Sequence, residues 1–87
     1  LGSGTSTGVP VPGCDCAVCS SPDPRNHRLR TSALVAPVGS PERVLIDTTT
    51  DLRAQLLRTR VKRVDGVLFT HAHADHILGL DDLRPMN

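Results

Sequence analysis

The spacing of apolar residues changes near residue 31. Before it, apolar positions follow neither a helical nor a strand period, and four glycines and four prolines interrupt the chain. Residues 1–30 are therefore expected to be loop, shaped by tight turns rather than by burial. Residues 31–36 and 43–47 are two short β-prone runs, separated by a Pro and Gly segment. This pattern predicts a β-hairpin.

A helix is expected directly after the hairpin. Three threonines followed by Asp51 give a helix-start signal with an acidic residue in the first turn. Leu52, Leu56 and Leu57 then form a narrow apolar stripe, and neighbouring arginines complete a solvated face. This spacing predicts a helix of about ten residues whose leucine stripe faces the core.

The next apolar run, residues 64–70, is typical of a strand buried on both faces. Further apolar positions after the run are Ile77, Leu78, Leu80 and Leu83. They indicate a short helix that Pro85 ends. The order strand, strand, helix, strand predicts an α/β layer, so residues 31–87 are expected to form the strands, the helix and the loop that carries the chemistry.

Length and composition narrow the functional classes. The chain has 87 residues, 38% of them hydrophobic, and a net charge of +1. This balance provides no strong field for nucleic acid or lipid. No segment approaches the roughly 18 apolar residues of a membrane-spanning helix, so a cytoplasmic protein without a membrane partner is expected. Because so short a chain cannot build a deep pocket alone and starts at Leu1, it is expected to be part of a longer domain.

Candidate metal ligands follow the apolar run, where His71, His73, Asp75 and His76 occupy six consecutive positions. A chance H-x-H-x-D-H is expected in roughly one such sequence per thousand. Side chains two apart share a face only on extended backbone, so His71 and His73 can hold one ion at a strand end. A helix beginning at Asp75 would aim Asp75 and His76 at a second ion roughly 3.5 to 4 Å away. Imidazole with carboxylate favours Zn²⁺, with Mn²⁺ or Fe as substitutes, and the alternative is an exposed turn that binds nothing.

A second cluster, Cys14, Cys16 and Cys19, lies in the Gly and Pro loop. Disulfides between such close neighbours are strained, and an odd number of cysteines disfavours them further. Three thiols suit three corners of a structural zinc site, and His27 is the candidate for the fourth position on this chain. Surface thiols without metal and a redox role are the alternatives.

Basic residues gather at positions 25–30 and 58–63. Guanidinium groups can bind phosphate through two hydrogen bonds. No aromatic residue for base stacking accompanies them in the sequence, so a nucleic-acid partner is only weakly indicated.

Three segments carry a resemblance to a known family. T-H-A-H-A-D-H at residues 70–76 matches the metal motif of the metallo-β-lactamase superfamily at every fixed position. L-G-S-G-T-S at residues 1–6 and L-I-D-T at residues 45–48 are similar to its first strand and to its acidic strand end. The resemblance spans nearly the whole chain and implies an α/β fold, the N-terminal half of an αββα sandwich, with residues 1–87 a partial domain.

The same resemblance assigns roles to individual residues. It implies that His71 and His73 ligate one catalytic divalent metal ion, that Asp75 and His76 ligate a second, and that a hydroxide between the ions is the nucleophile. Asp75 is then a catalytic residue, and Asp47 a supporting residue near the site. The family's later histidine ligands do not occur after His76, and Asp81 and Asp82 follow it too closely to be the family's bridging aspartate. The isolated chain is therefore expected to be inactive and to hold metal weakly or at one position.

A histidine directly after the motif aspartate points away from β-lactamases and toward the dinuclear branches. With the cysteine loop, the sequence looks most like the cyclic-phosphate phosphodiesterases of the carbon-phosphorus lyase pathway, in which a distant histidine completes the structural zinc. The resemblance implies a hydrolase with two catalytic ions, one structural zinc and a small phosphodiester substrate, and a homodimer is a further possibility. The alternatives are a tRNA 3′-processing ribonuclease, a thioesterase, or a non-catalytic zinc protein similar to pyrroloquinoline quinone biosynthesis protein B.

Overall fold

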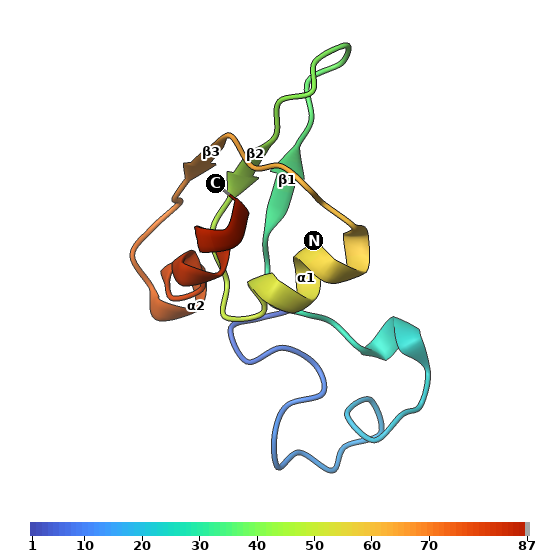
Figure 1. Cartoon of the computed structure of the whole chain (residues 1–87). Coiled ribbons are helices and arrows are strands. Elements are labelled where there is room, and N and C mark those ends of the chain that lie inside the picture. Colours follow the sequence, from blue (N-terminus) through green and yellow to red (C-terminus); the bar gives the residue numbers. More distant parts are fainter. Residues whose placement is uncertain (87) are drawn as a thin grey trace.

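A three-stranded sheet in the order β1-β2-β3 organises the fold (Figure 1). The computed structural model describes residues 1–86. The strands are β1 (Ala33–Val35), β2 (Val44–Ile46) and β3 (Gly66–Leu68). β1 and β2 pair antiparallel and are joined by the loop of residues 36–43, whereas β2 and β3 pair parallel because helix α1 (Leu52–Thr59) returns the chain to the start of β3. The predicted α/β order of strand, strand, helix and strand is confirmed.

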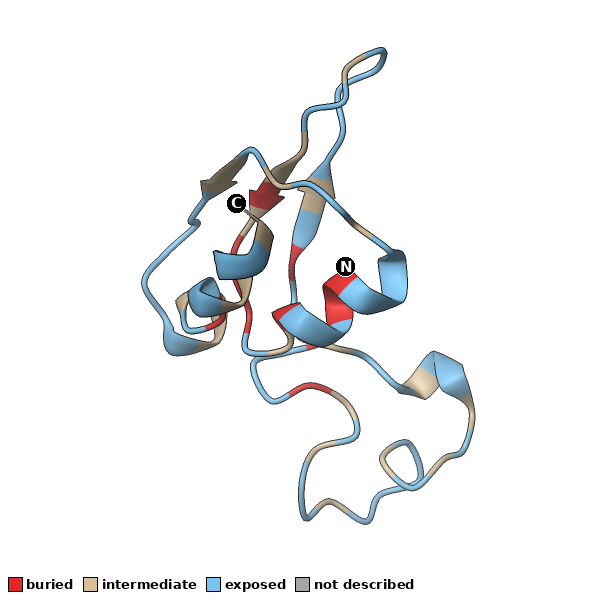
Figure 2. Ribbon diagram, viewed as in Figure 1, coloured by how far each residue is buried: buried red, intermediate tan, exposed pale blue. Residues whose placement is uncertain are grey.

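The core lies between α1 and one face of the sheet (Figure 2). Leu34, Leu45 and Val67 are paired across the three strands and so point to the same face. Leu45 packs with Leu52 and Leu56 of α1, and these three leucines are the buried hydrophobic residues within the described chain. The small size of this core follows from a single helix covering a single sheet face.

Two predictions about this core are wrong. Leu57 was expected in the buried stripe of α1, yet it is 61% exposed, because the helix turns it away from the sheet and presents Gln55 instead. Strand β3 was expected to be buried on both faces, yet Leu68 is also 61% exposed. β3 is an edge strand of the sheet, and α1 covers only the face that carries Val67.

Buried Gln55 joins α1 to the segment before β1. Its Nε2 donates to the Arg30 carbonyl oxygen at 2.7 Å, and its Oε1 accepts from the Thr49 hydroxyl at 2.8 Å. Asp51, at the start of α1, does not cap the helix with its side chain. Its carboxylate instead accepts the backbone N–H and the guanidinium of Arg30, both at 2.9 Å. The helix start is therefore anchored to the N-terminal segment.

We expect Gln55→Leu to lower the free energy of unfolding by about 2 to 4 kcal/mol, because the buried Thr49 hydroxyl loses its acceptor and the Arg30 carbonyl loses its donor. The reverse exchange on the exposed side of the helix, Leu57→Gln, serves as the matched control and is expected to change stability by less than about 0.5 kcal/mol. Urea denaturation of both variants measures the difference. Equal losses in the two variants would contradict the role given to Gln55.

Residues before β1 form an extended loop that lies against the sheet only near its ends (Figure 1). Isolated bridges join Gly2 to Ser32, Gly4 to Arg30 and Val9 to Arg28. A short 3-10 helix, η1 (Pro24–Asn26), is the only helical element in this part of the described chain. Residues 10–27, which the Val9–Arg28 bridge encloses, project away from α1 and carry the three cysteines (Figure 1).

Two short helices follow β3, namely α2 (Ala74–Ile77) and the 3-10 helix η2 (Leu80–Met86). The prediction that Pro85 ends a helix is wrong, because Pro85 lies inside η2. The fixed φ of proline, near −65°, falls within the range of 3-10 geometry. Among the described residues, no helix has the length and apolar character required to cross a membrane.

The segment after β2 holds α2 in place. Thr48 donates its backbone N–H to the His76 carbonyl at 2.9 Å and its hydroxyl to the Ile77 carbonyl at 3.0 Å. The Gly79 N–H donates back to the Thr48 carbonyl at 3.0 Å. Thr48 and Gly79 are both buried, so this contact fixes α2 beside the carboxyl ends of β2 and β3.

Candidate metal centres

The histidine cluster lies where strand β3 gives way to α2. His73 keeps extended backbone, with φ −66° and ψ 143°, and is the residue immediately before the helix. The helix begins at Ala74, so Asp75 and His76 lie in its first turn. The change from extended backbone to helix therefore falls between the two predicted ligand pairs.

The structure brings three imidazole rings together. The ring centroids of His71 and His73 are 4.5 Å apart, and those of His71 and His76 are 4.1 Å apart. His71 and His73 are exposed, whereas Asp75 and His76 are half-buried against the segment after β2. Nε2 of His76 lies 3.1 Å from Oδ2 of Asp75. All four predicted ligands therefore gather at one end of the sheet.

Asp47 lies beneath this cluster and is only 3% exposed. It follows β2 with φ 65°, in the left-handed region that aspartate enters more readily than most residues. Its Oδ1 accepts the Thr70 backbone N–H at 2.8 Å, and its Oδ2 accepts the Thr70 hydroxyl at 2.7 Å and Nδ1–H of His76 at 2.7 Å. Burial alone would raise the pKa of Asp47, but these hydrogen bonds from Thr70 and His76 outweigh it and hold the pKa below its usual range.

These contacts permit a test of whether the cluster suits a metal ion. A neutral His76 has a single ring proton, which its Nδ1 donates to Asp47. Its Nε2 therefore carries a lone pair that faces the Asp75 carboxylate. Two acceptor atoms at 3.1 Å repel each other unless a cation lies against them, either a second ring proton or a metal ion. Imidazole nitrogens beside a carboxylate are the donor set of Zn²⁺ and related divalent ions. The residues present therefore fit a divalent cation.

The cysteine cluster is more tightly assembled. The sulfur atoms of Cys14, Cys16 and Cys19 all lie within 4.8 Å of one another, and within residues 1–86 no other set of three potential ligands converges to this degree. Backbone N–H groups point at two of the sulfurs: that of Cys19 at Cys16, and that of Val11 at Cys19, each at 3.4 Å. These loop hydrogen bonds draw the three thiols to one point.

The thiols also influence one another's acidity. The backbone N–H of Cys19 and the neighbouring thiols lower the pKa of Cys16 to about 7. At Cys19 the Val11 N–H acts to lower the pKa, but the nearby Cys14 and Cys16 outweigh it, so the pKa rises. A thiolate is the form that binds metal, and crowding of several thiols favours a shared cation.

Other candidate ligands lie outside both clusters. The ring of His27 contacts the Ser21 carbonyl at 3.1 Å and does not join the converging cysteine set. Asp81 is exposed and pairs with Arg84, while Asp82 accepts the Arg53 backbone N–H at 3.2 Å. The fourth position of the cysteine site is therefore open among the described residues.

Thr70 belongs to the site but was not predicted to, because the sequence offers no sign of this beyond its place in the motif. Thr70 stands inside the motif, but only the structure shows that its hydroxyl joins Asp47 to Nδ1 of His71, at 2.8 Å from that nitrogen. Gly79 was missed as well, although a glycine inside an apolar helical pattern is a recognised sign of close packing.

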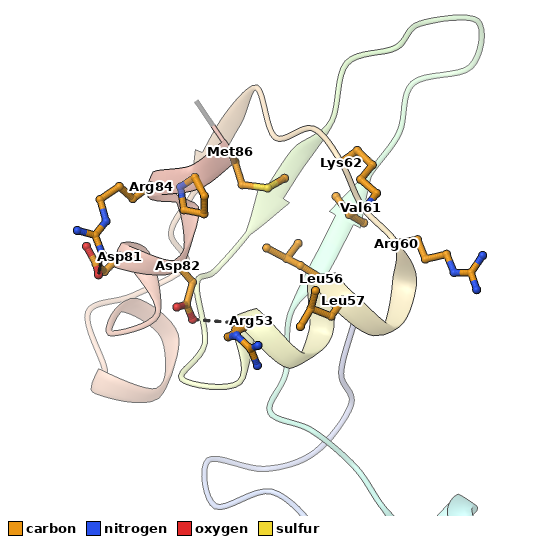
Figure 3. Close-up of a pocket in the computed structure, with 11 residues that line it drawn as sticks. Arg53, Leu56, Leu57, Arg60, Val61, Lys62, Asp81, Asp82, Arg84 and Met86 are labelled. Atoms are coloured by element: carbon orange, nitrogen blue, oxygen red, sulfur yellow. Dashed lines mark hydrogen bonds and ion pairs between the residues drawn. The ribbon is translucent and has the colours of Figure 1, made fainter.

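A groove of about 530 Å³ between α1 and η2 is separate from both clusters (Figure 3). Its apolar floor includes Leu56, Leu57 and Val61, and its rim carries arginine, lysine and aspartate side chains. None of the predicted metal ligands lines it.

Comparisons with known proteins agree with the architecture. A sequence model of the beta-lactamase superfamily domain matches residues 42–87. A crystal structure described as a new diphosphatase from the PhnP family is 61% identical with a TM-score of 0.91, over 98% of this chain and 33% of that one. Zn²⁺-bound PqqB from Methylobacterium extorquens is 29% identical with a TM-score of 0.80, over 95% of this chain and 32% of that one.

Two curated proteins are also similar in sequence. An octanoyltransferase of Porphyromonas gingivalis is 52% identical over 84 residues, which are 97% of this chain and 17% of that protein. A ribonuclease Z of Bradyrhizobium diazoefficiens is 43% identical over 61 residues, which are 68% of this chain and 19% of that protein. The chain thus spans about a third or less of the length of the proteins it matches.

Proposed function

The chain belongs to the beta-lactamase superfamily, and from this we propose that the protein is a metal-dependent phosphodiesterase. The observation that carries the proposal is the gathering of His71, His73, Asp75 and His76 above the buried carboxylate of Asp47. The similarity to a PhnP-family diphosphatase supports a phosphorus-centred substrate. A small phosphodiester is the substrate class we propose.

Each residue of the cluster has a defined task in this proposal. His71 and His73 hold one divalent ion, and Asp75 and His76 hold a second. Asp47 stays anionic, buried and hydrogen bonded, so it orients the ligands rather than reacting. Divalent cations held there would supply Lewis acidity toward a phosphoryl oxygen and activation of water near neutral pH. No side chain of the cluster needs to act as a nucleophile.

The test compares substrate classes with the full-length protein. A chromogenic phosphodiester, a precursor tRNA and a thioester are offered in parallel, each with added Zn²⁺ or Mn²⁺ and each after chelation. We expect the phosphodiester to be cleaved with the highest kcat/KM, at least about tenfold above the others, and chelation to abolish turnover. Faster cleavage of the tRNA or the thioester, or turnover that survives chelation, would overturn the proposal.

The similarity to ribonuclease Z favours a second candidate, a tRNA 3′-processing ribonuclease. The precursor tRNA in the same panel decides between the two. A third candidate, a non-catalytic zinc protein, is favoured by the converging thiols and by the likeness to Zn²⁺-bound PqqB. It predicts no turnover of any substrate in the panel.

We propose a structural role for the cysteine site, with a single zinc ion. Cys16→Ser in the full-length protein is expected to reduce the zinc content by one ion per chain, because a serine hydroxyl does not replace a thiolate in a structural site. Ser20→Ala changes an exposed neighbour and should leave the zinc content unchanged. Metal analysis by mass spectrometry measures both. Unchanged zinc in the Cys16 variant would contradict the assignment.

A further inference from the structure

One buried carboxylate is linked to two imidazoles of the histidine cluster. Oδ2 of Asp47 contacts Nδ1 of His76 directly at 2.7 Å. The same Oδ2 contacts the Thr70 hydroxyl at 2.7 Å, and this hydroxyl lies 2.8 Å from Nδ1 of His71. Asp47 therefore reaches His76 in one step and His71 in two, through Thr70.

The chemistry of each group determines where the protons lie in the hydrogen-bonded series from Asp47 through Thr70 to His71. The Asp47 carboxylate is ionised and only accepts hydrogen bonds, so the single Thr70 hydroxyl proton points at Asp47. The Thr70 oxygen then has only lone pairs to offer His71. A contact of 2.8 Å between that oxygen and Nδ1 requires the proton to sit on Nδ1.

The opposite assignment fails on the same contacts. If the Thr70 hydroxyl donated to His71, its oxygen would face Oδ2 of Asp47 at 2.7 Å with no proton between them. Such a contact between two acceptors survives only with a protonated carboxyl group. Both oxygens of Asp47 already face other donors, the Thr70 backbone N–H at Oδ1 and Nδ1 of His76 at Oδ2, so the carboxylate acts as an acceptor and offers no place for an added proton.

We propose that Thr70 is a positioning residue that fixes His71 in the tautomer whose Nε2 is the metal ligand. This inference rests on the proposed metal-dependent function, and deepens it by naming the donor atom. Asp47 fixes His76 in the same tautomer without an intermediary. The tautomers of His71 and His76, two of the four proposed ligands, are thus both fixed by the buried carboxylate of Asp47.

Two substitutions distinguish the contribution of the Thr70 hydroxyl from that of its backbone N–H. Thr70→Val keeps the shape and the backbone N–H that binds Asp47, but removes the acceptor for His71. Thr70→Ser keeps the hydroxyl and removes only a methyl group. Thermal denaturation of both full-length variants shows whether each is folded, and metal binding is then compared at equal folded fraction.

Two readouts beyond activity test the proposal. Zinc affinity is measured by competition with a chelating dye, and we expect a loss of about 10- to 100-fold in Thr70→Val and less than about 3-fold in Thr70→Ser. Long-range ¹H–¹⁵N spectra report the state of each ring nitrogen. In wild type and Thr70→Ser, we expect protonated Nδ1 on His71. In metal-free Thr70→Val that signature should be lost for His71 and kept for His76, which serves as the internal control; with zinc on Nε2 the proton lies on Nδ1 in every variant, so the comparison is made without metal.

The outcomes separate this inference from the function on which it rests. If the wild-type cluster binds no zinc beyond the cysteine site, the proposed function itself fails. If wild type binds zinc but Thr70→Val binds it equally tightly with His71 unchanged, only the role of Thr70 is overturned. Equal losses in the valine and serine variants would also overturn it, because the hydroxyl would then not be the group that matters.

Discussion

Gly79→Ala is expected to lower the free energy of unfolding by at least about 3 kcal/mol. A Cβ at this buried position would overlap the Thr49 carbonyl oxygen and lie 2.7 Å from the Thr49 carbonyl carbon. Both are backbone atoms, so no side-chain rotation relieves the clash. The added methyl group must therefore push α2 away from the segment after β2, and Asp75 and His76 with it.

Gly66→Ala is the matched control for this substitution. Gly66 lies in β3, and a Cβ there meets no atom within 4 Å. We expect its stability to stay within about 1 kcal/mol of wild type, with any gain arising from the less flexible unfolded chain. Thermal and urea denaturation compare the two variants. A Gly79 variant as stable as the Gly66 variant would show that α2 does not depend on this close approach.

Asp75→Asn is expected to lower kcat/KM of the full-length protein by at least about 100-fold while leaving the fold intact. The amide keeps the size of the side chain but removes the negative charge that faces Nε2 of His76 at 3.1 Å. Because Asp75 is half-buried in the first turn of α2 and supports no core contact, the loss should appear in activity and in metal content rather than in stability.

Asp81→Asn provides the corresponding control for the charge change. Asp81 lies a few residues further on, is exposed, and pairs only with Arg84 within the described chain. Its variant should turn over substrate like wild type. Full turnover by the Asp75 variant with the preferred phosphodiester would refute the assignment of Asp75 as a catalytic metal ligand.

The local sequence pattern was sufficient to predict the order of the strands and the first helix and to identify the ligand motif. Alternation and turn residues indicated the hairpin, and the apolar run before residue 70 indicated the strand that delivers His71. The change from extended backbone to helix falls at Ala74, one residue before the predicted start. These features depend on residues that are neighbours in the sequence, so they can be predicted from one amino-acid sequence without its tertiary contacts.

Errors arose where a residue's surroundings come from distant parts of the chain. Leu57 has the spacing of a core residue, but the orientation of α1 on the sheet buries Gln55 instead. The run containing Leu68 has the composition of a central strand, but the topology leaves it at the edge of the described sheet. Burial depends on which element packs on which face, and periodicity within one segment does not specify that partner.

Ligand chemistry and strand geometry are local properties, so the residue types suited to metal and their spacing can be recognised in the amino-acid sequence. How those ligands are held depends on contacts between distant segments. Asp47 and Thr70 lie 23 positions apart in sequence yet share hydrogen bonds of 2.7 and 2.8 Å, and Gly79 is buried against Thr49. Such contacts form when β2 and β3 pair in parallel and bring two strand ends together, which is a property of the folded sheet and of no single segment.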